Sequence, residues 1–208
     1  MDAKNVSAAA PKVTGAVFVA PIGTELPTDA KTELPEAYKE LGYVSDAGLV
    51  NSNSPSTTDV KEWGGTVVMS SLTDKPDNFK FKLIEVLRLD VLKTVYGSAN
   101  VTQDETGKIT IKAKAEDPEN MIWVFDMILS GKKLKRIIVS DGKITTVGDI
   151  EYTKSNASGF DLTIAAYPDS ENSTHTEYIE SAEEKAVSTA NEEAVSTTNE
   201  GDTEDAVG

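Results

Sequence analysis

The chain has 208 residues, enough to bury a hydrophobic core, and it carries 35 acidic against 20 basic side chains, a net charge of −15. A surface this negative repels phosphate and argues against tight binding of nucleic acid. Because the sequence contains no cysteine, disulfides, thiolate catalysis and cysteine-ligated zinc are excluded.

The N-terminal residues show no export or membrane signal. Their main apolar run, residues 16–20, stops at Pro21. A secretory signal needs about 7–15 apolar residues and a spanning helix about 20. We therefore expect residues 1–14 to form an N-terminal arm, and we expect neither export nor membrane insertion.

The long polar stretch "DAGLVNSNSPSTTD", residues 46–59, is predicted to be a structureless loop. Loops longer than about 12–15 residues are uncommon in compact domains and are usually functional. We therefore treat this loop and the tryptophan after it as the candidate contact site. Its candidate residues are Asp46, Leu49, Val50, Asn51, Asn53, Pro55, Thr58 and Trp63.

Most of residues 15–169 is predicted to form β-strands within one domain. Apolar and basic side chains alternate in 79–84 and 108–115, which predicts strands with one apolar face. The residues predicted to point inward are Phe79, Phe81, Leu83, Ile109 and Ile111.

One segment, "EVLRLDVLKTVYG" at residues 85–97, has a helical period instead. It predicts an amphipathic helix of about three turns, ended by Gly97 and laid on a sheet. The predicted packing face consists of Ile84, Leu87, Val91 and Val95.

Residues 121–129 are apolar on both faces of a predicted strand, so this strand should be covered on two sides or buried at a subunit contact. Further strands are predicted at 15–20, 63–70, 133–140, 146–154 and 159–168. Turn signals separate the last three of these strands and indicate an antiparallel meander.

The sequence offers no catalytic, metal-binding or cofactor-binding pattern, so we do not expect an enzyme and expect no cofactor. "DGKITTVGD", residues 141–149, lacks the ligand alternation of a calcium loop and is interpreted as a tight turn with Gly142 at positive φ. His175 has no histidine or cysteine with which to share a metal, and we expect it to be an exposed linker residue.

The two tryptophans leave a second function open. Trp63 and Trp123 could stack on sugar rings, although burial of Trp63 against the helix is the favoured interpretation. The alternative function is therefore a non-catalytic β-sandwich module that binds a carbohydrate or a protein ligand.

Residues 170–208 carry eleven acidic side chains against one lysine and contain the near-duplicate octamers "AVSTANEE" and "AVSTTNEG". Such a segment cannot build a core, and we expect an acidic, low-complexity tail. Truncation after about Ser181 should leave folding intact.

Several segments together resemble the major tail tube protein of long-tailed, non-contractile bacteriophages. They are "GTELPTDA", the helix-like "ELPEAYKELGYVS", "DAGL", "TDVKEWGG", "IEVLRLDVLKTVYG" and "GFDLTIAAYPD". Their order and spacing match over residues 15–169, while the acidic tail departs from relatives that add an immunoglobulin-like domain.

The resemblance implies a mainly β fold, an antiparallel β-sandwich or open barrel with one flanking α-helix and a long inter-subunit loop. It implies hexameric rings that stack into a tube, with the loop loose in the monomer and ordered on assembly. The implied partners are the chain itself, the tape measure protein, distal tail or baseplate proteins and the tail terminator, with DNA only as passing cargo. The implied location is the virion tail, after synthesis in the host cytoplasm.

Overall fold

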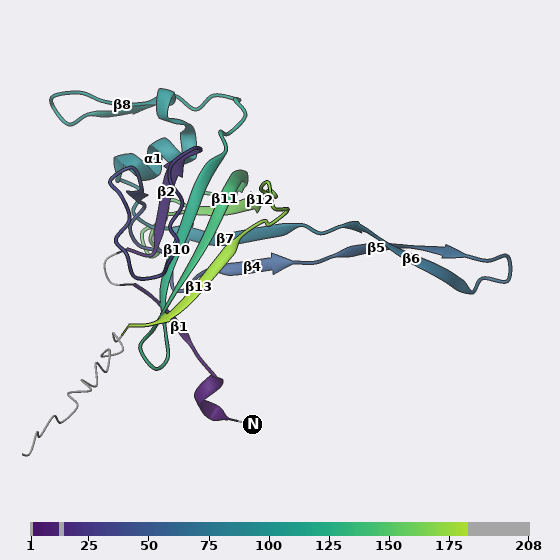
Figure 1. Ribbon diagram of the computed structural model, residues 1–208. Helices are drawn as coiled ribbons and strands as arrows, with labels where there is room; N and C mark the ends of the chain where they lie inside the picture. The colour runs from purple at the N-terminus through teal and green to yellow at the C-terminus, as the bar shows by residue number, and fades with distance from the viewer. Residues whose placement is uncertain (1, 13–14, 183–208) are drawn as a thin grey trace, which may run out of the picture.

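The computed structural model describes residues 2–12 and 15–182. These residues form an antiparallel β fold with one α-helix, α1 (Leu89–Tyr96), packed against the sheet (Figure 1). The predicted fold class, mainly β and antiparallel with a single flanking helix, is confirmed.

A nine-stranded sheet forms the body, in the order β3-β2-β10-β11-β12-β7-β4, with β1 beside β10 and β13 beside β11. Its strands are β1 (Ala9–Pro11), β2 (Val17–Pro21), β3 (Lys39–Glu40), β4 (Val50–Asn53), β7 (Asp77–Leu83), β10 (Met121–Leu129), β11 (Lys133–Val147), β12 (Phe160–Ala166) and β13 (Thr176–Ser181). Two separate strand pairs are β5 (Ser56–Lys61) with β6 (Val67–Asp74), and β8 (Val101–Gln103) with β9 (Ile109–Ile111). Short 3-10 turns lie at Ala3–Asn5 and Ser98–Asn100.

The central strands β10 and β11 each pair with two different strands along one edge. β10 pairs with β2 near its start and with β1 at its end. β11 pairs with β13 near its start and with β12 further along. The sheet therefore continues in different directions from the two ends of the β10–β11 pair and can curve around a core.

The main core lies between the inner face of the sheet and α1. Alternate residues of β7 and β12 are buried, which confirms the predicted inward face of 79–83. From β10 the aromatic rings of Trp123 and Phe125 join this core, and from α1 it receives Val91 and Leu92. Each fully buried side chain of this size contributes about 1.5–3 kcal/mol to stability.

The opposite face of β10 is buried as well. Ile122 and Val124 pack with Ile138 and with Tyr38, which comes from the connection between β2 and β3. Two-sided burial is confirmed for residues 122–126, while residues 121 and 127–129 are half-buried. The second cover belongs to this same chain, so the apolar character of β10 does not indicate a subunit contact.

The helix is shorter than the sequence pattern predicts. Ile84 and Leu87 precede α1, and Leu87 is 84 % exposed, so their assignment to the packing face of the helix is wrong. Val91 and Val95 do pack on the core. Before the helix, the carboxylate of Glu85 accepts a hydrogen bond from the Tyr43 backbone N–H at 2.8 Å, which ties this stretch down as a connection.

Three other local predictions are corrected. Residues 33–45 contain no helix, only the short strand β3. In 108–115 only Ile109–Ile111 forms a strand, and it lies outside the main sheet, with Ile111 exposed. The predicted strands at 133–140 and 146–154 are replaced by one continuous strand, β11, that ends at Val147.

Gly142 lies inside β11 and not in a tight turn with positive φ. Close packing requires glycine at this position, because a Cβ there would lie 2.7 Å from Trp123 Cδ1 and 3.0 Å from Val139 Cγ1. The indole Nε1 of Trp123 also donates to the Gly142 carbonyl oxygen at 3.2 Å.

Substituting Gly142→Ala should therefore destabilise the fold by about 1–3 kcal/mol, because a core this tight cannot accept a methyl group without moving. Urea unfolding followed by tryptophan fluorescence measures the loss. Gly64→Ala is the control, since its added methyl would meet only the flexible Glu62 side chain. Equal unfolding midpoints for the two variants would contradict the packing argument.

The sheet extends beyond the segment 15–169. β1 lies in the predicted N-terminal arm and pairs with β10, while β13 follows Asp169 and pairs with β11. Residues 183–208, most of the predicted acidic tail, lie outside the described residues.

Candidate assembly interface

The predicted loop at 46–59 is not structureless. β4 pairs with β7 in the main sheet, and β5 pairs with β6 beyond it, so the chain runs out and back as a long hairpin. Residues 54–76, which we call the projecting hairpin, extend far from the body (Figure 1). Every residue from 50 to 75 is exposed.

Local chemistry explains the turn at the hairpin tip. Gly65 has φ +90°, a conformation that glycine adopts without strain. The Glu62 backbone N–H donates to the Thr66 carbonyl at 2.9 Å, and the Glu62 side chain accepts from the Thr66 N–H at 3.3 Å. Hydrogen bonds from the backbone N–H groups of Gly64 and Thr66 lower the pKa of the Glu62 carboxyl.

Trp63 lies in this turn and is fully exposed, at 105 % of its reference area. The predicted burial of Trp63 against the helix is wrong, whereas Trp123 is buried in the core. The turn carries Trp63 away from every core residue because β5 and β6 form no part of the main sheet.

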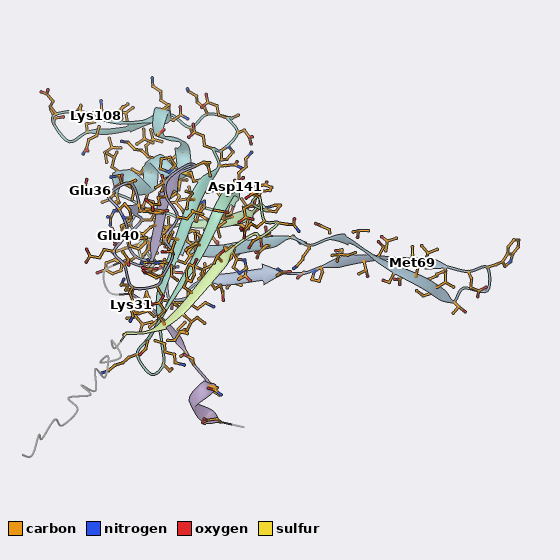
Figure 2. All side chains as sticks on the ribbon, in the orientation of Figure 1. Lys31, Glu36, Glu40, Met69, Lys108 and Asp141 are labelled. Atoms are coloured by element: carbon orange, nitrogen blue, oxygen red, sulfur yellow. The ribbon has the colours of Figure 1, made fainter. Side chains whose placement is uncertain are left out.

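The projecting hairpin exposes apolar side chains on both of its faces. Val60 lies opposite Met69 on one face, and Leu72 lies opposite Thr57 on the other. Figure 2 shows side chains, Met69 among them, standing clear of the body on both sides of the ribbon. The exposed apolar residues of the hairpin are Val60, Trp63, Val67, Val68, Met69 and Leu72.

Both long edges of the β5–β6 ribbon are also unpaired among the described residues. Unpaired strand edges and exposed apolar side chains are the features by which one chain recruits another. The ribbon is therefore suited to contact with a further protein chain.

The structure divides the predicted site residues into two groups. Val50, Asn53, Pro55, Thr58 and Trp63 are exposed along the hairpin and its root, and Asp46 is exposed in the turn before it. Leu49 packs against the main core instead. Asn51 is exposed, but its side-chain Nδ2 donates at 2.7 Å to Asp77, a buried residue of β7.

Asp77, which the sequence pattern did not single out, fixes the root of the hairpin. Only 2 % of it is exposed, and its carboxylate accepts hydrogen bonds from Asn51 and from the Thr174 hydroxyl at 2.6 Å. His175 Nδ1 lies 2.5 Å from Asp77 Oδ2, and the imidazole ring stands edge-on to Phe79. The prediction that His175 is an exposed linker residue is therefore wrong.

Burial raises the pKa of Asp77, but the hydrogen bonds from Thr174, Asn51 and His175 outweigh burial and hold the pKa below its ordinary value of 3.8. A carboxyl whose folded-state pKa is depressed contributes stability above its unfolded pKa, and that contribution is lost as pH falls through the folded pKa.

We expect Asp77→Asn to destabilise the protein by about 1–3 kcal/mol at pH 7, because an NH2 donor replaces one of the two acceptor oxygens that serve Asn51, Thr174 and His175. Below pH 3.8 the difference between the parent and the variant should shrink as the parent carboxyl protonates. Urea midpoints measured at pH 7 and near pH 3 test this sign. A difference that grows on acidification would refute it.

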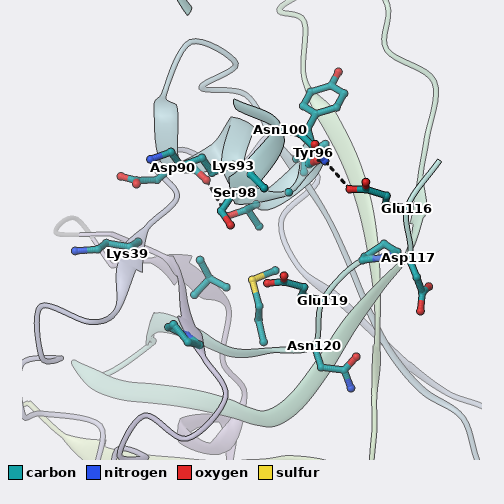
Figure 3. Close-up of a pocket in the computed structure, with 18 of the residues that line it drawn as sticks. Lys39, Asp90, Lys93, Tyr96, Ser98, Asn100, Glu116, Asp117, Glu119 and Asn120 are labelled. Carbon is teal, nitrogen blue, oxygen red and sulfur yellow. Dashed lines mark hydrogen bonds between the residues drawn. The ribbon is translucent and has the colours of Figure 1, made fainter. Parts of the chain in front are cut away.

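Two grooves border these elements. One, of about 780 Å³, lies at the hairpin root between Asn53, Leu72 and Tyr167. The other, of about 540 Å³, lies between α1, the start of β10 and the end of β2 (Figure 3).

Across the described chain, no cluster of three or more potential metal ligands occurs. No helix in the described segments is long and apolar enough to cross a bilayer.

An antiparallel β body that holds an exposed apolar hairpin away from its core defines a structural protein suited to assembly with other chains. The sequence matches the model of a family described as phage tail tube protein over residues 2–190, and the chain belongs to that family. No curated protein sequence matches it. The family is a structural one, and it makes this chain a component of the virion tail.

Proposed function

We propose that this protein assembles into hexameric rings that stack to form the tail tube, and that the tube conducts genome DNA into the host cell. Membership of the tail tube family supports the role in the tail. Ring size, stacking and DNA passage are the proposed details.

The observation that carries the proposal is the projecting hairpin. A free monomer holds Val68, Met69 and Leu72 more than half exposed on a ribbon with unpaired edges. Burial of such surface in a contact stabilises an assembly by about 25 cal/mol per Å² of apolar area. A protrusion that inserts into a different surface of the next copy makes a head-to-tail contact, which generates rings and stacks.

The charge of the chain supports passage of DNA without retention. A net charge of −15 provides little of the phosphate neutralisation that drives nucleic-acid affinity. We propose that DNA is passing cargo and that the tape measure protein, the distal tail or baseplate proteins and the tail terminator are the other partners. Synthesis in the host cytoplasm would precede assembly.

Negative-stain electron microscopy of the concentrated protein, with a tail initiator complex supplied, tests the proposal. Hollow tubes of stacked six-fold rings are the expected result. Sedimentation velocity as a monomer under all of these conditions would overturn it.

The exposure of Trp63 keeps one alternative in view, a module that binds carbohydrate. Ligand sites are usually concave and combine several groups. Trp63 lies instead on a convex tip, and the other tryptophan is buried. Quenching of the fluorescence of the monomer by polysaccharide, without polymerisation, would favour the binding module.

A further inference from the structure

Trp63 is the most exposed large apolar residue of the described chain, and it lies in the turn between β5 and β6. None of its atoms takes part in a hydrogen bond or ring contact within the described chain. Tryptophans that become buried in a pocket of a partner are, with tyrosine and arginine, enriched among the residues that contribute most to protein interfaces. The structure therefore has an anchor without a pocket of its own.

A groove of suitable size lies on another part of the same molecule. It is formed by α1, the 3-10 turn after it, the end of β2 and residues 116–121 (Figure 3). Its volume of about 540 Å³ accommodates an indole side chain. Its apolar lining comes from Val19, Ala20, Pro21, Ile22, Val95 and Met121.

The groove and the hairpin tip lie on different sides of the body. In Figure 1 the projecting hairpin leaves on one side, while α1 and β2 lie toward the opposite side. The tip of one copy therefore cannot fill the groove of that copy, but it can reach the groove of the next copy in a head-to-tail array. Contacts of this heterologous type close into rings or extend into stacks.

The charges around the groove complement those beside Trp63. Figure 3 shows three acidic residues, Glu116, Asp117 and Glu119, in the segment before β10, and Lys39, Lys93 and Asp90 across the groove from Glu116 and Asp117. Lys93 and Glu119 have no ion-pair partner among residues 2–12 and 15–182. The tip presents the exposed Lys61 two residues before Trp63, so its ammonium group can pair with the acidic residues at the rim.

The groove also borders an acceptor without a donor. Asn100 lines it, and its side-chain Oδ1 is buried without a hydrogen-bond partner in the described structure. Its Nδ2 donates to Tyr96 O at 2.9 Å and to Glu116 Oε2 at 3.1 Å, which holds the amide at the groove wall. This oxygen is itself covered, so an indole N–H from a docked chain could donate to it only if the amide turned toward the groove.

We propose that Trp63 of one copy docks into the groove between α1 and residues 116–121 of a second copy of this chain. The contact rests on the proposed function, since it forms between subunits of the tube. Lys61 then pairs with the acidic residues at the rim of the groove, and the indole fills its apolar floor.

The chain contains two tryptophans, and Trp123 is already fully buried. A change in fluorescence on assembly therefore reports Trp63. In the monomer, acrylamide should quench one of the two indoles strongly. In sedimented tubes the emission should shift to shorter wavelength and the accessible fraction should be lost.

A plug in the groove tests where Trp63 docks. Ala99 is exposed and lines the groove, so Ala99→Phe should raise the concentration needed for assembly at least about tenfold, as should Trp63→Ala. Ala157→Phe is the matched control, because Ala157 is exposed in the connection before β12 and does not line the groove. In tubes, p-benzoylphenylalanine at position 63 should cross-link to residues 89–121 of another copy.

The outcomes separate this contact from the proposed function. Failure of the parent protein to polymerise overturns the function and the contact together. Tubes in which Trp63 stays open to acrylamide overturn the contact alone. Cross-links that map outside 89–121, or equal effects of Ala99→Phe and Ala157→Phe, overturn the assignment of the groove.

Discussion

Replacing residues 54–76 by an Asn-Gly turn is expected to abolish tube formation while the body stays folded. Asn53 pairs with Asp77 across β4 and β7, so a two-residue turn can close this hairpin directly. The residues removed are exposed, apart from a half-buried Pro76, and contribute little to the core. We expect the free energy of unfolding to change by less than about 1 kcal/mol. Electron microscopy and urea unfolding give the two measurements.

A milder variant separates the contribution of the hairpin's shape from that of its apolar side chains. Threonine in place of Val60, Val67, Met69 and Leu72 keeps a β-prone ribbon but removes its apolar contacts, and it should also prevent assembly. Tubes that form as readily from either variant as from the parent would rule out the hairpin as an assembly element. The cut must not reach further back, because Asn51 donates to buried Asp77 and its loss would damage the body.

The strands of the body were predictable because burial imposes a period of two on the sequence. In β7 and β12 alternate residues face the core, and in β10 both faces are covered, so the apolar pattern follows directly from the packing. For Gly142 the same kind of sequence reasoning gave a wrong prediction, a turn in place of a strand. Asp-Gly favours a turn locally, but tight packing against Trp123 gives glycine a second reason to occur within a strand.

Only the returning half of the projecting hairpin was predicted as a strand: the strand expected at 63–70 overlaps β6, whereas β5 lies largely in the stretch expected to be a loop. Its polar residues bury nothing within the monomer, so no periodicity marks β5, and only its pairing with β6 makes it a strand. Trp63 was expected in the core because large aromatic side chains are usually buried. The contact proposed for Trp63 with a second copy would account for this departure from the rule.

The contacts that anchor the hairpin root could not be predicted from the spacing of residues along the chain. Asp77 and His175 are 98 positions apart, and neither belongs to a motif. Their contact depends on how the connection after β12 returns past β7 before β13 begins. Pairwise contacts of this kind are a product of the tertiary fold, and a single sequence carries no local signal of them.

The largest loss of stability is expected from Arg136, whose side chain is 1 % exposed. Its guanidinium forms two hydrogen bonds with the buried carboxylate of Asp126, at 2.7 and 2.8 Å. It also donates to the carbonyl oxygens of Asp29 and Thr32, at 3.0 and 2.9 Å, and so ties down the connection between β2 and β3. Removing Arg136 leaves the buried Asp126 carboxylate with only the more distant Lys12 ammonium, 3.6 Å away, so Arg136→Leu should cost about 3–5 kcal/mol.

Arg136→Lys should recover less than half of that loss, because an ammonium group cannot reproduce the planar set of four hydrogen bonds. Lys80→Ala is the control: its pair with Asp161 is exposed at 3.6 Å and should contribute less than about 1 kcal/mol. Release of the connection would also uncover Ile122 and Val124, so the variant should bind a hydrophobic dye and aggregate instead of forming tubes. Urea unfolding of Arg136→Leu with a cost no greater than that of Lys80→Ala would show that the buried pair does not hold this side of the sheet together.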